Sequence, residues 1–431
     1  MLGVVFLIFR FYPQLGLGRL IWRFWPIVVI VWGFAKLIDH LAARRTGERT
    51  TVLTGDEAAL LIVVIFCLAG LGFADWLRKR SDFDFNFHPF QQRYSESEAL
   101  PAKKISPGAH IAIDTRRGNI FVHTTDGDEL RVTVNKSASD SNESAADERM
   151  AAAKTVIEQT SDGFRVHPIN QENWEGTVEA DLDIELPKQA SVTADSDRGD
   201  ITVAGIGGAV NAGTRSGDIE IHDAGSDVAA TLNKGNLRIS NVAGNVRVNG
   251  RGSEIDVSDV AGDASFDGEF FGPIRVRNVA KTTHYVSQRS DLTLVHLTGR
   301  MDLSSDLQVS DVGGMTKLAT HDKDIEIEDV TGPLDVADSH GNIRIRFAHL
   351  PTGEINITDD SGQVDLTLPA KSSFEISAVS RSGEVESEFQ DPSLQLVNDQ
   401  NTGKLNGKFG SRGPKISIVT SYGTISLHKA T

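Results

Sequence analysis

The feature that most constrains this fold is a repeat of about eighteen residues in the second half of the chain. Each unit holds a triplet in which a polar residue stands between two aliphatic ones, as in Ile219-Glu220-Ile221. Side chains alternate between the two faces of a β-strand, so each triplet predicts a strand with one buried face. The triplets begin at Ile201, Ile219, Leu237, Ile255, Ile274, Leu292, Leu307, Ile325 and Ile343, with looser copies at Val364 and Val385.

A second strand and two tight corners complete each unit. Shorter aliphatic patterns follow many triplets after nine residues, and they begin at Val210, Val228, Val246, Ala264, Met301 and Leu334. The corners read aliphatic-x-Asp/Asn-Val-x-Gly, and glycine and Asx residues suit tight turns. Connections this short leave no room for helical crossovers. We therefore predict an all-β fold, a parallel β-solenoid of about eleven rungs, called coils below, in which each repeat forms one coil.

The repeat and the patterns around it divide the chain into five parts. They are a transmembrane helical region at 1–80, a juxtamembrane linker at 81–108, N-terminal strands and a capping helix of the solenoid at 109–198, the regular solenoid at 199–390, and C-terminal cap strands at 391–431. One coil alone buries too few side chains to offset the entropy of ordering its backbone. Neighbouring coils must therefore stack, and the two ends of the stack need covers.

Two segments are expected to cover those ends. Ser144–Glu158 predicts an amphipathic helix over the first coil, with Asn142 or Ser144 as its N-cap. Its apolar face would carry Met150, Ala153 and Ile157. At the other end, Lys415–Val419 and Gly423–Leu427 flank a short turn and predict a terminal hairpin.

The outward middle residues of the triplets form a ladder, meaning residues at one position on consecutive coils. They are Thr202, Glu220, Arg238, Asp256, Arg275, Thr293, Gln308, Glu326 and Arg344. Signs alternate wherever charges adjoin. We expect ion pairs along Glu220–Arg238–Asp256–Arg275 and between Glu326 and Arg344, which oppose slipped registers. The alternative is a charged stripe that binds a ligand.

Residues 1–80 predict an integral membrane region. Ala58–Leu77 is an apolar run closed by three basic residues, and Leu20–Leu41 is a second run with cations near its ends. About 20 apolar residues span a bilayer core. The alternative is a buried hairpin in a soluble protein. In the linker, alternating phenylalanines (Phe83, Phe85, Phe87) indicate either a short interfacial strand or a flexible tether.

The first nine residues, Met1–Phe9, are as apolar as the later runs but too short to span a bilayer. We expect that this start truncates a further helix. Basic residues flank Ala58–Leu77 on both sides, so loop charge favours neither orientation strongly. Counting three helices with the N-terminus inside places the solenoid on the outer, extracytoplasmic face of the cell membrane.

Charge is distributed unevenly along the chain. Residues 1–80 contain ten Lys/Arg and five Asp/Glu, whereas residues 81–431 contain 33 and 54, which gives net charges of +5 and −21. An acidic body of this size argues against nucleic acid as a partner, because phosphate backbones are bound by Lys and Arg. The single cysteine, Cys67, excludes an intrachain disulfide and any site that needs several cysteines.

No residue pattern indicates a catalytic, cofactor-binding or metal site, and we expect no cofactor. Asp223, Asn241, Asp259, Asn278, Asp311 and Asp329 recur at one corner position, which indicates a structural Asx ladder; calcium binding is the functional alternative. The twelve histidines show no metal-binding spacing. The glycine-rich string Gly205–Gly213 is not followed by a helix, so we interpret it as a solenoid corner and not a phosphate loop.

From about His110 to Leu427 the chain resembles the bacterial putative-adhesin family, β-helical domains of unknown function. The resemblance rests on the strand–helix–strand entry, the Asp181–Pro187 string DLDIELP and the SGDIEI-type repeats. It implies a stacked β-fold and association with the cell surface or envelope, and it defines no catalytic residues. Trp25–Gly33 is similar to the membrane segments of Lia-type envelope-stress proteins.

Three functions are consistent with these observations. The first is a non-enzymatic, membrane-anchored surface or envelope interaction domain, with the lipid bilayer as one partner through residues 1–80 and a protein or glycan on the solenoid face as another. The second is an envelope-stress sensor or regulatory scaffold that works through its membrane helices. The third is a polysaccharide-active β-helix enzyme, which would need carboxylates converging in one groove.

Overall fold

The computed structural model describes residues 92–140, 142–169 and 178–430. The expected membrane helices and residues 81–91 of the juxtamembrane linker, with its alternating phenylalanines, lie outside these residues. The rest of the predicted linker, 92–108, contains two strands. Within the described ranges, no helix has the length and apolar character needed to cross a bilayer.

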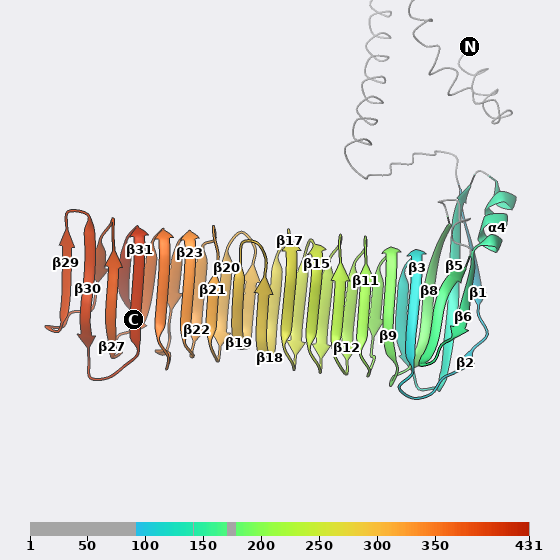
Figure 1. Cartoon of the computed structure of the whole chain (residues 1–431), viewed down its shortest axis with the longest axis horizontal. Helices are drawn as coiled ribbons and strands as arrows, with labels where there is room; N and C mark the ends of the chain where they lie inside the picture. The colour runs from blue at the N-terminus through green and yellow to red at the C-terminus, as the bar shows by residue number, and fades with distance from the viewer. Residues whose placement is uncertain (1–91, 141, 170–177, 431) are drawn as a thin grey trace, which may run out of the picture. The chain divides into compact units, whose positions relative to one another are not determined.

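The described strands wind into a long solenoid with two strand-lined faces (Figure 1). In spatial order, face A contains β5 (Glu129–Asp140), β8 (Val178–Pro187), β4 (Ile120–Thr125), β10 (Ile201–Ala204), β12 (Ile219–Ala224), β14 (Leu237–Val242), β16 (Ile255–Val260), the first part of β18 (Ile274–Val286), the last part of β19 (Asp291–Leu303), β20 (Leu307–Val312), β22 (Ile325–Val330), β24 (Ile343–Arg346), β26 (Val364–Pro369), β32 (Ile425–Ala430) and β28 (Val385–Ser387).

Face B lies across the core from face A. Its spatial order is β6 (Lys154–Gln159), β7 (Gly163–Ile169), β3 (His110–Arg117), β9 (Ser191–Arg198), β11 (Val210–Thr214), β13 (Val228–Leu232), β15 (Val246–Gly252), β17 (Ala264–Phe270), the last part of β18, the first part of β19, β21 (Thr316–Ala319), β23 (Leu334–His340), β25 (Ile355–Ser361), β31 (Lys415–Tyr422), β27 (Phe374–Ser380), β30 (Thr402–Phe409) and β29 (Leu394–Asp399).

The predicted stacking of coils is confirmed by the strand register. Ile219 pairs with Leu237 and Leu237 pairs with Ile255, in each case between parallel strands one coil apart. All three side chains are at most 1% exposed and belong to one continuous aliphatic core. The outward residues between them stay in register as well. Face A also contains strands outside the predicted series of triplets, namely β5, β8, β4, the last part of β19 and β32.

The chain reverses direction twice in the middle of the solenoid, before and after β19, and the repeat did not predict this: β19 is antiparallel to β18 and also to β20 and β21. β18 and β19 are antiparallel and joined by a turn at residues 287–290. Leu292 therefore pairs with Tyr285 and Leu318 on face B, whereas Met301 pairs with Val276 on face A. The repeat predicted Leu292 in the first strand of a coil and Met301 in the second strand, and both predictions were wrong, because the two residues lie on the opposite faces. An alternating pattern looks the same in either chain direction, so it does not show which way a strand runs.

The predicted terminal hairpin is also wrong. β31 lies between β25 and β27, and β32 lies between β26 and β28, all in parallel pairs. The C-terminus consequently sits among the last coils and not at the end of the stack (Figure 1). The turn before β32 is an ordinary solenoid corner, where Gly423 has a φ of 146°. The cap at this end is instead the antiparallel pair β30 and β29, which extends face B beyond β27.

The N-terminal end is built from antiparallel strands and one helix. β1 (Gln92–Ala99) and β2 (Lys103–Lys104) pair with β5, and the first coil of the chain, β3 with β4, is inserted between later strands.

Helix α4 (Glu143–Ala152) has Asn142 as its N-cap, as expected. It ends before Ile157, which belongs to β6, and packs Ala146 and Met150 against β5 in a small separate cluster. The helix therefore covers β1 and β5, not the first coil directly.

Corner glycines let consecutive coils approach closely. At Gly217, φ is 154°, and a Cβ would lie 2.1 Å from the carbonyl oxygen of Gly199 on the coil below. An added methyl group would have to push backbone against backbone, which no side-chain movement can relieve.

We predict that Gly217→Ala lowers the free energy of unfolding by about 2–4 kcal/mol, measured by chemical denaturation. Gly127→Ala is the matched control, because the nearest atoms to its Cβ would lie 3.9 Å away. Equal stabilities of the two variants would contradict the close contact between coils.

Candidate interaction site

The recurring corner carboxylates and amides support the backbone. Asp223, Asn241, Asp259, Asn278, Asp311 and Asp329 all have φ between 52° and 59°. Their side chains also meet across coils: the Asn241 amide donates to Asp223 at 2.6 Å. A second ladder on another corner accepts backbone N–H groups, since Asp200 accepts from Asp218 N and Asp218 accepts from Asn236 N, both at 2.8 Å. The structural interpretation of these residues is supported.

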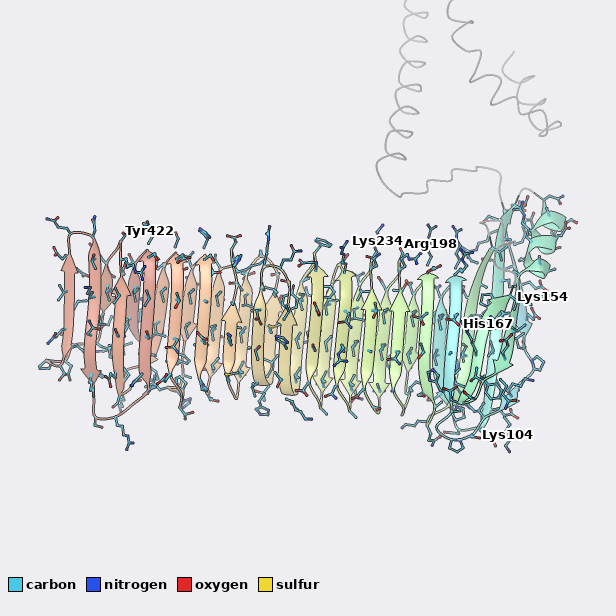
Figure 2. The ribbon with its side chains drawn as sticks, viewed as in Figure 1. Lys104, Lys154, His167, Arg198, Lys234 and Tyr422 are labelled. Carbon is cyan, nitrogen blue, oxygen red and sulfur yellow. The ribbon has the colours of Figure 1, made fainter. Side chains whose placement is uncertain are left out.

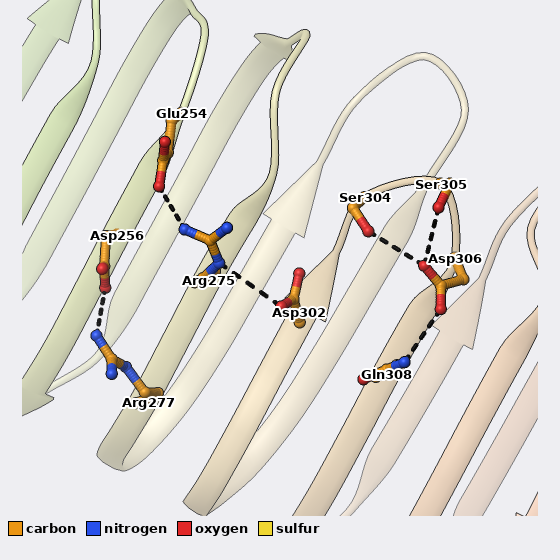
Figure 3. Close-up of polar contacts among 9 residues, drawn as sticks. All are labelled: Glu254, Asp256, Arg275, Arg277, Asp302, Ser304, Ser305, Asp306 and Gln308. Carbon is orange, nitrogen blue, oxygen red and sulfur yellow. Dashed lines mark hydrogen bonds and ion pairs between the residues drawn. The ribbon is translucent and has the colours of Figure 1, made fainter.

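The outward charge ladder on face A keeps the expected register up to Arg275, but its ion pairs differ from those expected (Figure 3). Arg275 contacts Glu254 and lies 3.7 Å from Asp302, while Asp256 binds Arg277 at 2.8 Å. Asp302, not Thr293, follows Arg275 in the ladder because the chain reverses there. Positive and negative groups thus neutralise each other along this face, and pairs this exposed stabilise the fold only slightly.

A ladder of inward polar residues runs along one corner of face B. At the N-terminal end it consists of Thr115, Ser196 and Thr214, and the hydroxyls of Ser196 and Thr214 donate to glycine carbonyls. Farther along, two neighbouring coils carry Asp338 and Asp359 at the same position, only 5% and 1% exposed.

These two buried aspartates are incompletely hydrogen-bonded. Thr320 donates to Asp338 Oδ1 at 2.6 Å, and Thr420 donates to Asp359 Oδ2 at 3.4 Å. Within the described part of the chain, Asp338 Oδ2 and Asp359 Oδ1 accept no hydrogen bond. Burial raises the pKa of Asp359 to about 6, and the charge of Asp338 on the adjacent coil adds to this rise. Extending the period-two pattern from Leu334 and Ile355 would have placed both aspartates inside.

We predict that Asp359→Asn stabilises the protein near pH 7.5 by roughly 1–3 kcal/mol. Because the pKa of Asp359 is raised on folding, its contribution to stability is full below pH 4 and is lost as the pH rises through 6. The variant should therefore show a flatter dependence of stability on pH between 4 and 7.5. Asp335→Asn, an exposed change on β23, should leave the wild-type pH dependence intact; an unchanged slope in Asp359→Asn would contradict the assignment.

The C-terminal end of the solenoid is open on one side. Face B continues through β30 and β29, whereas face A, in the described part of the chain, ends at β28. The gap left opposite β29 and β30 is a cavity of about 460 Å³. It is lined by Ser387, Phe389, Gln390, Asp391, Pro392, Leu394, Leu396 and Leu405.

The base of this cavity is formed by packed aromatic rings. Phe389 packs edge-on against Phe374 and Phe409, with ring centroids 5.2 and 5.0 Å away, and Lys429 Nζ lies 5.2 Å from its ring centre. The side-chain amide of Asn398 reaches across the end, accepting from Val385 N and donating to Val385 O, both at 3.1 Å. These bonds protect the edge of β28.

The edge of β29 has no such protection. Among the described strands β29 pairs with β30 alone, and its register places Leu396 opposite the buried Leu405 and Val397 opposite Lys404. Leu396 is 46% exposed and Val397 is 56% exposed, one on each side of the strand. Natural edge strands usually carry charges, prolines or bulges that prevent pairing, whereas Asp399 is the only charged residue of β29. The leucines and the valine of β29 are visible in the sequence, but the place of this strand at the edge is not.

Other exposed groups are less concentrated. Figure 2 shows Arg198, Lys234 and Tyr422 along one long edge of the solenoid. His123 lies 3.3 Å from Asp183 and 3.6 Å from Glu185 on the outer side of face A. Among the described residues, no group of three or more His, Cys, Asp or Glu side chains is arranged to hold a metal ion.

The stacked coils define an all-β, solenoid-like domain. A family model described as Toastrack DUF4097 matches residues 109–428, and the chain belongs to this family. A search of curated proteins gave no significant match.

Two solved structures are similar over most of this chain. One is described as a "putative cell adhesion protein" from Clostridium sporogenes, with 9% identity, coverage of 78% of this chain and 100% of that one, and a TM-score of 0.20. The other is described as a "putative lipid binding protein" from Parabacteroides distasonis, with 10% identity, coverage of 78% and 97%, and a TM-score of 0.19.

Proposed function

We propose that this protein is a non-enzymatic, membrane-anchored solenoid that binds a partner in the cell envelope through its open C-terminal end. The observation that carries the proposal is the contrast between this end and the rest of the surface. The end combines a 460 Å³ cavity, lined by both apolar and polar side chains, with an unprotected edge strand. Face A, by comparison, carries ion pairs that neutralise each other.

The non-enzymatic part of the proposal rests on what the carboxylates already do. Corner residues such as Asp200 and Asp218 accept hydrogen bonds from the backbone of the next coil. The buried Asp338 and Asp359 face the core and are closed to a substrate by their burial. A glycosidase would instead need two carboxyl groups facing one groove.

The membrane anchor follows from the apolar runs Leu20–Leu41 and Ala58–Leu77. They precede Gln92, where β1 begins, and β1 lies at the opposite end of the solenoid from β29 (Figure 1). The open end is therefore the part of the solenoid farthest from the point where the chain enters it. Display on the outer face of the membrane would place this end within reach of envelope or surface partners.

We predict that the full chain fractionates with membranes and that a C-terminal epitope is accessible to antibody on intact cells. Removing residues 1–80 should release a soluble solenoid that still binds its partner. Epitope exposure only after lysis would contradict display on the outer face. A deletion variant that binds normally but loses its cellular phenotype would favour the regulatory scaffold over the interaction domain.

A further inference from the structure

We propose that the partner of the open end is the same end of a second copy, so that two solenoids join end to end through antiparallel pairing of their β29 strands. This inference rests on the proposed function, because it names the occupant of the same site. Among the described strands, none pairs with the outer edge of β29, and the half-exposed Leu396 beside the cavity has no apolar cover. A second copy supplies a pairing strand and an apolar cover at once, in the self-complementary manner of a two-fold interface.

The register of this pairing follows from the two sides of β29. A two-fold axis perpendicular to the sheet keeps core-side residues opposite core-side residues. Centring it on Leu396 places the two Leu396 side chains opposite each other beside both cavities, and Gln395 opposite Val397. Centring it on Val397 would instead place Leu396 opposite Asn398, an apolar group against an amide. The leucine-centred register is therefore preferred.

Charge favours this end for contact between two copies. Residues 81–431 carry a net charge of −21, so two solenoids repel each other along their lengths. Residues 381–412, which form the open end, carry four Lys/Arg and five Asp/Glu, a net charge of −1. End-to-end contact brings together the nearly neutral surfaces and keeps the acidic bodies apart.

The geometry also sets the direction of the pair. Each solenoid begins at β1, at the end opposite β29 (Figure 1), so the two ends at which the chains enter their solenoids face away from each other. Such a pair would link two anchored chains tip to tip. A contact between β29 and an N-terminal edge strand would instead repeat without closing and form filaments.

The test uses the full chain in lipid nanodiscs that hold one copy each, with particle masses measured over a range of concentrations. Particles should shift from one disc to two as the concentration rises. Leu396→Lys, which places two lysines opposite each other at the two-fold axis, should weaken this association by at least about tenfold. Met315→Lys is the matched control, since Met315 is also 46% exposed but lies at the corner between β20 and β21 in mid-solenoid. Equal thermal unfolding midpoints would show that both variants are folded.

Single discs at every concentration, assemblies larger than two discs, or equal association of Leu396→Lys and wild type would each overturn the proposal. Binding of the same samples to intact cells distinguishes a failure of the end-to-end pairing from a failure of the proposed function. If wild type stays single yet binds cells and Leu396→Lys does not, the open end has a foreign partner. If neither binds cells and wild type stays single, the proposed function fails as well.

Discussion

The fold depends on backbone hydrogen bonds between consecutive coils. No coil can satisfy the N–H and C=O groups of its strands alone, because its two strands lie on opposite faces and pair only with the coils above and below. The same stacking closes the aliphatic core and brings corner residues into contact, so Asp200 can accept the N–H of Asp218. Glycine corners, Asx ladders and aliphatic triplets are thus consequences of one spacing between coils.

This dependence makes the ends the critical parts of the molecule. At both ends an early or late coil is inserted between others: β3 with β4 near the start, and β31 with β32 near the finish. Insertion gives each of these coils neighbours on both sides, so the chain cannot fray from its last strand. As a result the two faces end unevenly: face B extends past face A and leaves the cavity beside β29.

The sequence predicted the repeat, the two strands of each coil and the buried aliphatic positions, because these are local properties with a clear period. It could not predict the reversal between β18 and β19, since Leu292 and Met301 fit either face equally well once strand direction is unknown. The position of β32 between β26 and β28 depends on long-range pairing, and its pattern resembles that of every other coil. The open end could not be predicted for the same reason. Leu396 is exposed because β29 pairs with β30 on one side and lies at the edge of face B, and this position depends on long-range pairing.

The distance between two outward positions on face A tests the winding most directly. In a Cys67→Ser background, spin labels at Glu220→Cys and Glu326→Cys would be separated by six strand spacings, through Arg238, Asp256, Arg275, Asp302 and Gln308. At about 4.8 Å per spacing, the solenoid predicts a narrow distribution of label distances near 29 Å. A much shorter distance, as in a sheet folded back on itself, or a broad distribution would contradict the stacked coils.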